Sequence, residues 1–133
     1  KVFGLITIMG AILGILMFLS GHTFVPLISG VLFGILADVI ISLGKFKSKA
    51  FSILGYTMFS FWISGMIVPF WVMRDAYERM MLDSMGTEYT IKVLDLFDKI
   101  SWGFPILLCI GGIIGAFLGL TMLKKHFKKA GIA

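Results

Sequence analysis

Thirty-six consecutive residues, Val2 to Ala37, contain no Asp, Glu, Lys or Arg. A run of this length exceeds the roughly 20 apolar residues that a helix needs to cross a bilayer. The chain of 133 residues is 59% hydrophobic and 14% charged, whereas soluble domains carry about 25% charged residues. The sequence therefore predicts an all-α integral membrane protein.

Four apolar stretches predict four transmembrane helices, at about 2–19, 24–43, 51–73 and 102–123. Each approaches the length that spans a bilayer, and the first is at the short end of the range. The chain starts directly in an apolar run without an initiator Met, so we expect a truncated N-terminus, with a first helix free to start upstream of Lys1. We treat residues 1–133 as one transmembrane domain.

Two lysine-rich segments, 44–50 and 124–129, orient these helices. Both are expected to be cytoplasmic because Lys and Arg are enriched in cytoplasmic loops, and the two crossings between them make that assignment consistent. Loop 20–26 and segment 74–101 would then face outside, and both termini would be cytoplasmic. We expect a multi-pass protein of the plasma membrane, in lipid and without nucleic acid, because its positive charge lies at helix ends.

Segment 74–101 carries an amphipathic pattern. Apolar residues fall on one helical face at positions 89, 93, 96, 97 and 100, and a shorter stripe joins Tyr77, Met81 and Met85. Two short outer helices fit this pattern. They would either rest at the lipid interface or form a lid over a pocket.

Small residues recur at a spacing of four in three stretches: Gly10 and Gly14, Gly30 and Gly34, and Gly111, Gly115 and Gly119. This spacing lets helix backbones approach closely in lipid, where no hydrophobic force drives helices together. The glycines are expected to pack the bundle internally, with docking against another membrane subunit as the alternative.

Asp38 is the only carboxylate inside a predicted span. A carboxylate near the midplane would indicate proton or cation coupling. Asp38, however, lies only five residues before Leu43, roughly 8 Å from the helix end at 1.5 Å per residue. We expect it to reach the interface or to pair with Lys45, which argues against a small proton-coupled antiporter.

His22 interrupts the apolar run at the predicted outer turn, in "FLSGHTFVPLIS". Three roles are open: a solvated loop residue, a ligand to a metal or haem iron, or a hydrogen-bonding group for a substrate. Tyr77 and the methionines at 80, 81 and 85 could supply a second aromatic or soft ligand. No cluster at metal-ligand spacing accompanies His22, so no metal site is predicted.

The sequence contains no catalytic or nucleotide-binding motif: there is no Gly-rich phosphate loop, no Ser/His/Asp set and no HExxH. We therefore expect neither an enzyme nor a resident cofactor.

Several stretches together resemble the Trep_Strep family of substrate-binding subunits (S components) of energy-coupling-factor (ECF) transporters. They are "FGLITIMGAILGILMFLSGHTFVPLISGVLFGILADVI", "KSKAFSILGYTMFSFWISG", "PFWVMRDAYERMM" and "GLTMLKKHFKKAGIA". The likeness covers essentially the whole chain, and the tail is its most specific part. S components have six helices with cytosolic termini, so the resemblance implies that this chain holds the last four.

The resemblance implies a subunit of an ABC importer that binds a micronutrient at its outer face. Its partners would be a transmembrane T component and two ATPase subunits, which alone use ATP. The pocket would lie at the outer helix ends, where the candidate residues are His22, Phe24, Trp71, Arg74, Tyr77, Met81 and Trp102. A flat, largely apolar substrate such as haem or a vitamin is expected. The alternatives are a structural or assembly membrane protein and a stand-alone small transporter.

Overall fold

A computed structural model describes residues 2–123 and 125. This part of the chain is helical and contains no strand. Its helices are α1 (Leu5–Leu19), α2 (Val25–Leu43), α3 (Lys49–Ser60), α4 (Ser64–Val72), α5 (Arg74–Met85), α6 (Thr87–Ile100) and α7 (Phe104–Met122). Short 3-10 turns, Phe61–Ile63 and Ser101–Gly103, join α3 to α4 and α6 to α7. The predicted stretches 2–19, 24–43, 51–73 and 102–123 correspond to α1, α2, α3 with α4, and α7.

Three helical stretches in the described residues are long and apolar enough to cross a membrane: Val25–Leu43, Lys49–Val72 and Thr87–Met122. The apolar part of the last stretch is α7, because α6 carries five charged residues. α1 is also apolar but has only 15 residues, fewer than the roughly 20 that a crossing needs. The predicted all-α integral membrane fold is confirmed, with three long apolar helices and a shorter fourth.

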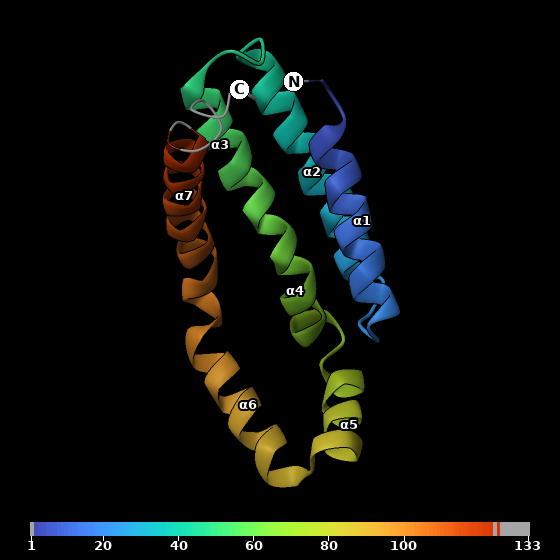
Figure 1. Cartoon of the computed structure of the whole chain (residues 1–133). Coiled ribbons are helices and arrows are strands. Elements are labelled where there is room, and N and C mark those ends of the chain that lie inside the picture. Colours follow the sequence, from blue (N-terminus) through green and yellow to red (C-terminus); the bar gives the residue numbers. More distant parts are fainter. Residues whose placement is uncertain (1, 124, 126–133) are drawn as a thin grey trace.

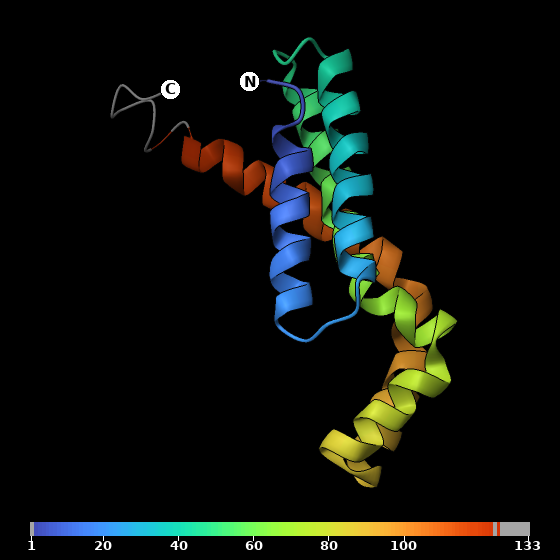
Figure 2. The same cartoon turned by 90° about the vertical axis from the view of Figure 1, so that its right-hand side faces the viewer.

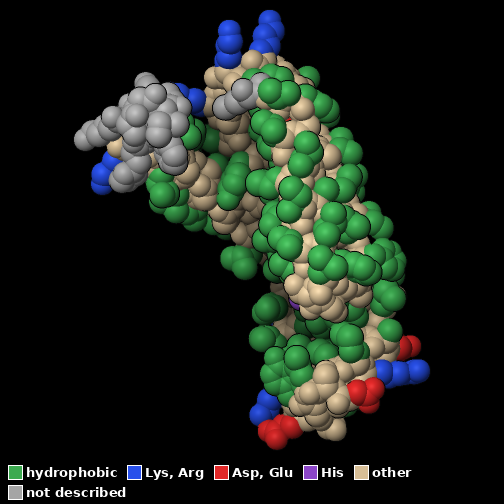
Figure 3. All heavy atoms as spheres, turned by 45° about the vertical axis from the view of Figure 1, so that its right-hand side comes forward, with side chains coloured by type: hydrophobic (Ala, Val, Ile, Leu, Met, Phe, Trp, Pro, Cys, Tyr) green, Lys and Arg blue, Asp and Glu red, His purple; other side chains and the backbone are tan. Residues whose placement is uncertain are grey.

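The helices run up and down between two ends of the molecule (Figure 1). One end, called the lysine end here, consists of the α2–α3 loop (44–48) and the last turn of α7. The other, called the hairpin end, consists of the α1–α2 loop (20–24) and the α5–α6 hairpin. Figure 3 shows Lys and Arg at the lysine end, both charge signs at the hairpin end, and mainly hydrophobic side chains on the flank between them.

Glycines bring α1 and α2 into backbone contact. A Cβ on Gly10 would overlap the carbonyl oxygen of Gly30, and a Cβ on Gly34 would lie 2.7 Å from the Cα of Thr7. Gly14 lies in the same way against Leu27. Close backbone approach of this kind holds helices together where lipid supplies no hydrophobic drive. The glycines at 10, 14, 30 and 34 therefore pack α1 on α2.

α7 packs on α3 through a different glycine register from the one expected. Gly112 is the close-contact position, because a Cβ there would lie 2.9 Å from the Cα of Thr57. A Cβ on Gly115 would meet the side chain of Tyr56, whereas Gly111 and Gly119 have no described atom within 4 Å. α7 leans across the other helices (Figure 2), and it is Gly112 rather than Gly111 that faces α3.

Asp38 does not pair with Lys45, and that expectation is wrong. Its carboxylate is 2% exposed and accepts hydrogen bonds from the backbone N–H and the hydroxyl of Thr7, at 2.9 and 2.7 Å. The backbone N–H of Ile6 donates a longer one at 3.4 Å. The first N–H groups of a helix lack partners within that helix. Asp38 in α2 therefore caps the start of α1.

The predicted third span is not one continuous α-helix, because the 3-10 turn Phe61–Ile63 interrupts it. The hydroxyl of Ser29 in α2 donates a hydrogen bond of 2.8 Å to the carbonyl oxygen of Trp62 in this turn. Backbone groups freed at membrane depth need partners within the protein. Ser29 thus ties the interruption to α2.

Candidate functional site

A cavity of about 410 Å³ lies at the hairpin end. Its walls come from the α1–α2 loop, α4, α5 and α6, four segments that are distant in the sequence. The lining residues are Ser20, Gly21, His22, Met66, Ile67, Phe70, Tyr77, Met80, Met81, Met85, Tyr89 and Val93. Its volume falls in the range of about 300–1,000 Å³ that is usual for small-molecule sites.

The α1–α2 loop holds His22 at the mouth of this cavity. The backbone N–H of His22 donates a hydrogen bond of 3.1 Å to the carbonyl oxygen of Met17. The backbone N–H of Gly21 donates one of the same length to the carbonyl oxygen of Phe18. Gly21 has a φ of 90°, a left-handed conformation that glycine adopts without steric cost. The turn therefore ends α1 and places an exposed imidazole against the cavity.

An aromatic cluster supports the floor of the cavity where α4 gives way to α5. Phe70 lies 4.7 Å from Tyr77 and 4.8 Å from Phe97, measured between ring centroids. Trp71 also contacts Phe97, with 5.7 Å between the ring centroids. Offset and tilted aromatic pairs at these distances are stabilising beyond their buried area. The cluster joins the end of the third span to both helices of the hairpin.

An ion pair closes the base of the hairpin. The guanidinium of Arg74 donates two hydrogen bonds of 2.8 Å to the two carboxylate oxygens of Asp98. This hydrogen bonding, with the charge of Asp98, raises the pKa of Arg74 above its ordinary value. The pair links residues 24 positions apart and fixes the start of α5 beside the end of α6.

The cavity wall is largely apolar and rich in methionine. No Asp, Glu, Lys or Arg lines it, and four of its residues are methionines. Thioethers make favourable contacts with aromatic rings. The imidazole of His22 and the hydroxyls of Tyr77 and Tyr89 can orient a ligand through hydrogen bonds.

The described part of the chain offers no metal site of the usual His, Cys, Asp and Glu ligands. No group of three or more His, Cys, Asp or Glu side chains is arranged to hold an ion there. Any soft-metal ligation in the cavity would have to use His22 with thioethers.

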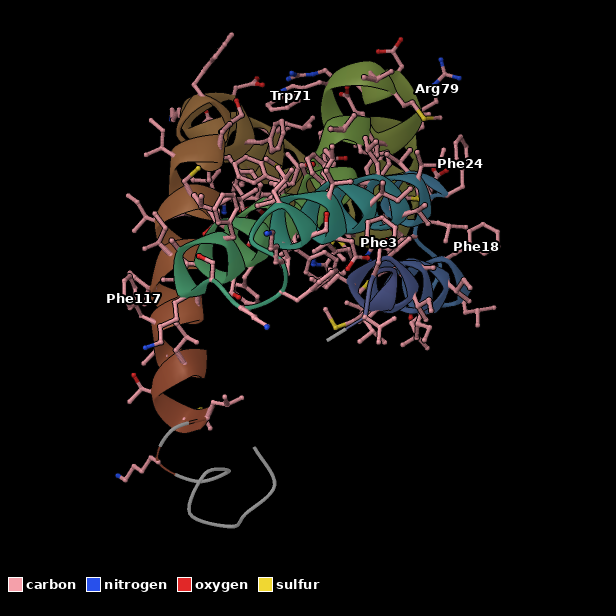
Figure 4. All side chains as sticks on the ribbon, turned by 90° about the horizontal axis from the view of Figure 1, so that it is seen from above. Phe3, Phe18, Phe24, Trp71, Arg79 and Phe117 are labelled. Atoms are coloured by element: carbon pink, nitrogen blue, oxygen red, sulfur yellow. The ribbon has the colours of Figure 1, made fainter. Side chains whose placement is uncertain are left out.

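The structure brings three of the seven sequence-predicted pocket residues together: His22, Tyr77 and Met81 line the cavity. The other four do not line it. Phe24 points outward from the bundle (Figure 4), Trp71 and Arg74 serve the hairpin base, and Trp102 is 89% exposed. Met81 is only 6% exposed, so it is also a structural residue of the hairpin.

Seven wall residues were not among the named candidates: Ser20, Gly21, Met66, Ile67, Phe70, Tyr89 and Val93. Tyr89 and Val93 belong to the amphipathic stripe that predicted α6. The sequence placed them on the apolar side of that helix, but it did not decide whether this side contacts lipid or a cavity. Residues 66, 67 and 70 lie in a uniformly apolar span, where nothing in the sequence distinguishes a cavity-facing position from a lipid-facing one.

A protein-family comparison identifies the family of this chain. The model of the Trep_Strep family, described as a hypothetical bacterial integral membrane protein, matches residues 1–129. No curated protein matches the chain, and no solved structure does.

Proposed function

We propose that this chain, which belongs to the Trep_Strep family of bacterial integral membrane proteins, is the substrate-binding membrane subunit (S component) of an ECF-type ABC importer. The observation that carries the proposal is the uncharged cavity at the hairpin end, which has the volume of a small-molecule site. Its walls combine a loop, a membrane helix and an amphipathic hairpin, a construction that suits capture from solution.

The orientation of the chain agrees with uptake. Lys45, Lys47 and Lys49 lie at the end opposite the cavity, and cytoplasmic loops are enriched in Lys and Arg. The lysine end is then cytoplasmic and the cavity opens outside. α1 would be a short fourth crossing; it begins at Leu5, directly after Gly4 with a φ of 93°, and not upstream of Lys1 as expected.

The wall favours a flat, apolar micronutrient such as haem or a vitamin as the substrate. Met66, Met80, Met81 and Met85 offer polarisable thioethers, and the rings of Phe70 and Tyr77 offer aromatic surface. A strongly anionic substrate would leave its charge uncompensated, because no Arg or Lys lines the cavity. His22 would orient the substrate through its imidazole, or ligate the iron if the substrate is haem.

The chain itself would bind and release the substrate, and partner proteins would supply the energy. We infer docking on a membrane T component that is driven by two cytosolic ATPase subunits. The amphipathic hairpin would act as the lid of the cavity, held at its base by Arg74 and Asp98.

Native mass spectrometry of the tagged full-length protein, purified from its own membranes, tests the proposal. We expect masses that match a T component and two ATPases, with an added small-molecule mass that identifies the substrate. A bare monomer or homo-oligomer without ligand across several detergents would contradict it and favour a structural or assembly protein. Substrate uptake into vesicles by the purified chain alone would instead identify a stand-alone transporter.

A further inference from the structure

α3 and α7 separate toward the lysine end. Near their middle, a Cβ on Gly112 would lie 2.9 Å from the Cα of Thr57. Three residues later, a Cβ on Gly115 would meet only the ring of Tyr56, at 3.1 Å, and Gly119 has no described atom within 4 Å. Figure 2 shows the end of α7 leaning away from the other helices. The two helices therefore leave a space between their ends.

This space is a hollow of about 330 Å³, lined by Lys49, Ile53, Phe117, Leu120 and Thr121. A second hollow of about 240 Å³ lies along the same helix pair and shares Ile53 and Leu120. Apart from Lys49, the first hollow presents apolar side chains and the Thr121 hydroxyl, which already donates to the carbonyl oxygen of Phe117 at 2.9 Å. Phe117 points out from α7 into the surroundings (Figure 4). The hollow thus opens sideways, where lipid lies.

Among the described residues, no carboxylate pairs with Lys49, which brings a positive charge to the hollow. The ion pairs of the described residues join Arg74 to Asp98, Lys92 to Glu88 and Lys99 to Asp95, all at the hairpin end. The remaining nearby carboxylate, Asp38, is occupied by Thr7. Lys45 and Lys47 of the adjoining loop add further positive charge. An anionic group is therefore the complementary partner for this rim.

We infer that the hollow between α3 and α7 binds one anionic phospholipid, with an acyl chain along Ile53, Phe117 and Leu120 and its phosphate at Lys49. Basic pockets between membrane helices favour anionic headgroups. The inference is independent of transport, because it uses neither the cavity at the hairpin end nor any partner subunit.

The test is lipid binding to the delipidated full-length protein, followed by native mass spectrometry. Phosphatidylglycerol and phosphatidylcholine with identical acyl chains are titrated separately, and the first bound lipid is quantified. We expect phosphatidylglycerol to bind about fivefold more tightly than phosphatidylcholine. Lys49→Gln should remove most of this preference. Lys92→Gln, which makes the same charge change at the hairpin end, should leave it intact.

Leu120→Trp provides a second variant, because its larger side chain fills the hollow and should weaken the binding of both lipids. Circular dichroism and melting temperature establish that each variant is folded. Equal binding of the two lipids, or an unchanged preference in Lys49→Gln, would overturn the inference. A dimer that forms at the expense of bound lipid and is broken by Leu120→Trp would also overturn it, since the hollow would then belong to a second copy of the chain.

Discussion

The carboxylate of Asp38 in α2 accepts hydrogen bonds from both the backbone N–H and the hydroxyl of Thr7 in α1, at 2.9 and 2.7 Å. A buried charge in a membrane protein is expensive unless it is hydrogen-bonded. Here the hydrogen bonds that stabilise the buried carboxylate of Asp38 also give partners to the free backbone N–H groups at the start of α1. Asp38 is therefore a structural capping residue that fixes α1 against α2.

Asp38→Ala should destabilise the protein by about 2–3 kcal/mol, because it leaves the part-buried donors of Thr7 without an acceptor. Thr7→Val should lose only about 1 kcal/mol, since the backbone N–H keeps its partner. The measurement is the free energy of unfolding in mixed micelles. Asp95→Ala, which removes an exposed carboxylate paired with Lys99, is the control and should stay near wild type. Equal losses for Asp38→Ala and Asp95→Ala would refute the capping role.

Gly10→Ala should destabilise the α1–α2 pair by about 1–3 kcal/mol, because its Cβ would overlap the Gly30 carbonyl and force the backbones apart. Gly111→Ala adds the same methyl group where no described atom lies within 4 Å. It should be neutral or stabilising by up to about 1 kcal/mol from helix propensity. Thermal unfolding of both variants in one detergent gives the comparison. A loss at Gly111 as large as at Gly10 would show that the open face of α7 is covered.

Arg74→Gln should loosen the α5–α6 hairpin, because it removes both hydrogen bonds to Asp98. Amide hydrogen exchange in α5 and at the end of α6 should become several-fold faster, while α2 stays protected. Arg74→Lys keeps the charge but loses the two-pronged geometry, so it should restore only part of the protection. Lys92→Gln breaks an exposed pair within α6 and is the matched control. Unchanged exchange in Arg74→Gln would mean that the aromatic cluster alone holds the hairpin.

His22→Ala should reduce the retention of the co-purified small molecule about three- to tenfold, the effect of losing one ligand hydrogen bond. Tyr77→Phe tests the second polar group of the cavity and should show a smaller reduction. Trp102→Ala lies outside the cavity and should retain the ligand at wild-type level. Native mass spectrometry gives the bound fraction for each variant. Loss of ligand in Trp102→Ala but not in His22→Ala would place the site elsewhere.

Much of the fold could be read from the sequence. Uncharged runs of the length of a bilayer predict helices, because a single segment in lipid can satisfy all its backbone hydrogen bonds within itself only as a helix. The apolar stripe through Tyr89, Val93 and Phe97 predicted α6 by its period. The break in the first apolar run predicted a turn at His22. The order of the predicted spans placed His22 at the same end of the molecule as Tyr77 and Met81. Those three residues line the cavity.

The contacts between helices could not be read in this way. Gly111 and Gly112 are adjacent and equally small, yet only Gly112 packs against α3. Trp71 and Arg74 are residue types that often line pockets, but here they contact Phe97 and Asp98 at the base of the hairpin. Met66 and Phe70 line the cavity although their sequence surroundings are uniformly apolar.

The sequence by itself determined that the chain is a helical membrane protein, where its helices lie and which of its ends carries the lysines. Only the tertiary structure decided that Asp38 meets Thr7 instead of Lys45, that Gly112 is the contact of α7 with α3, and that four segments line one cavity. The physical reason is that lipid tails are as apolar as the side chains of a neighbouring helix. Hydropathy therefore does not decide whether an apolar residue faces lipid or another helix. Steric fit and the need to satisfy buried hydrogen bonds make that choice, and both depend on residues that are far apart in the chain.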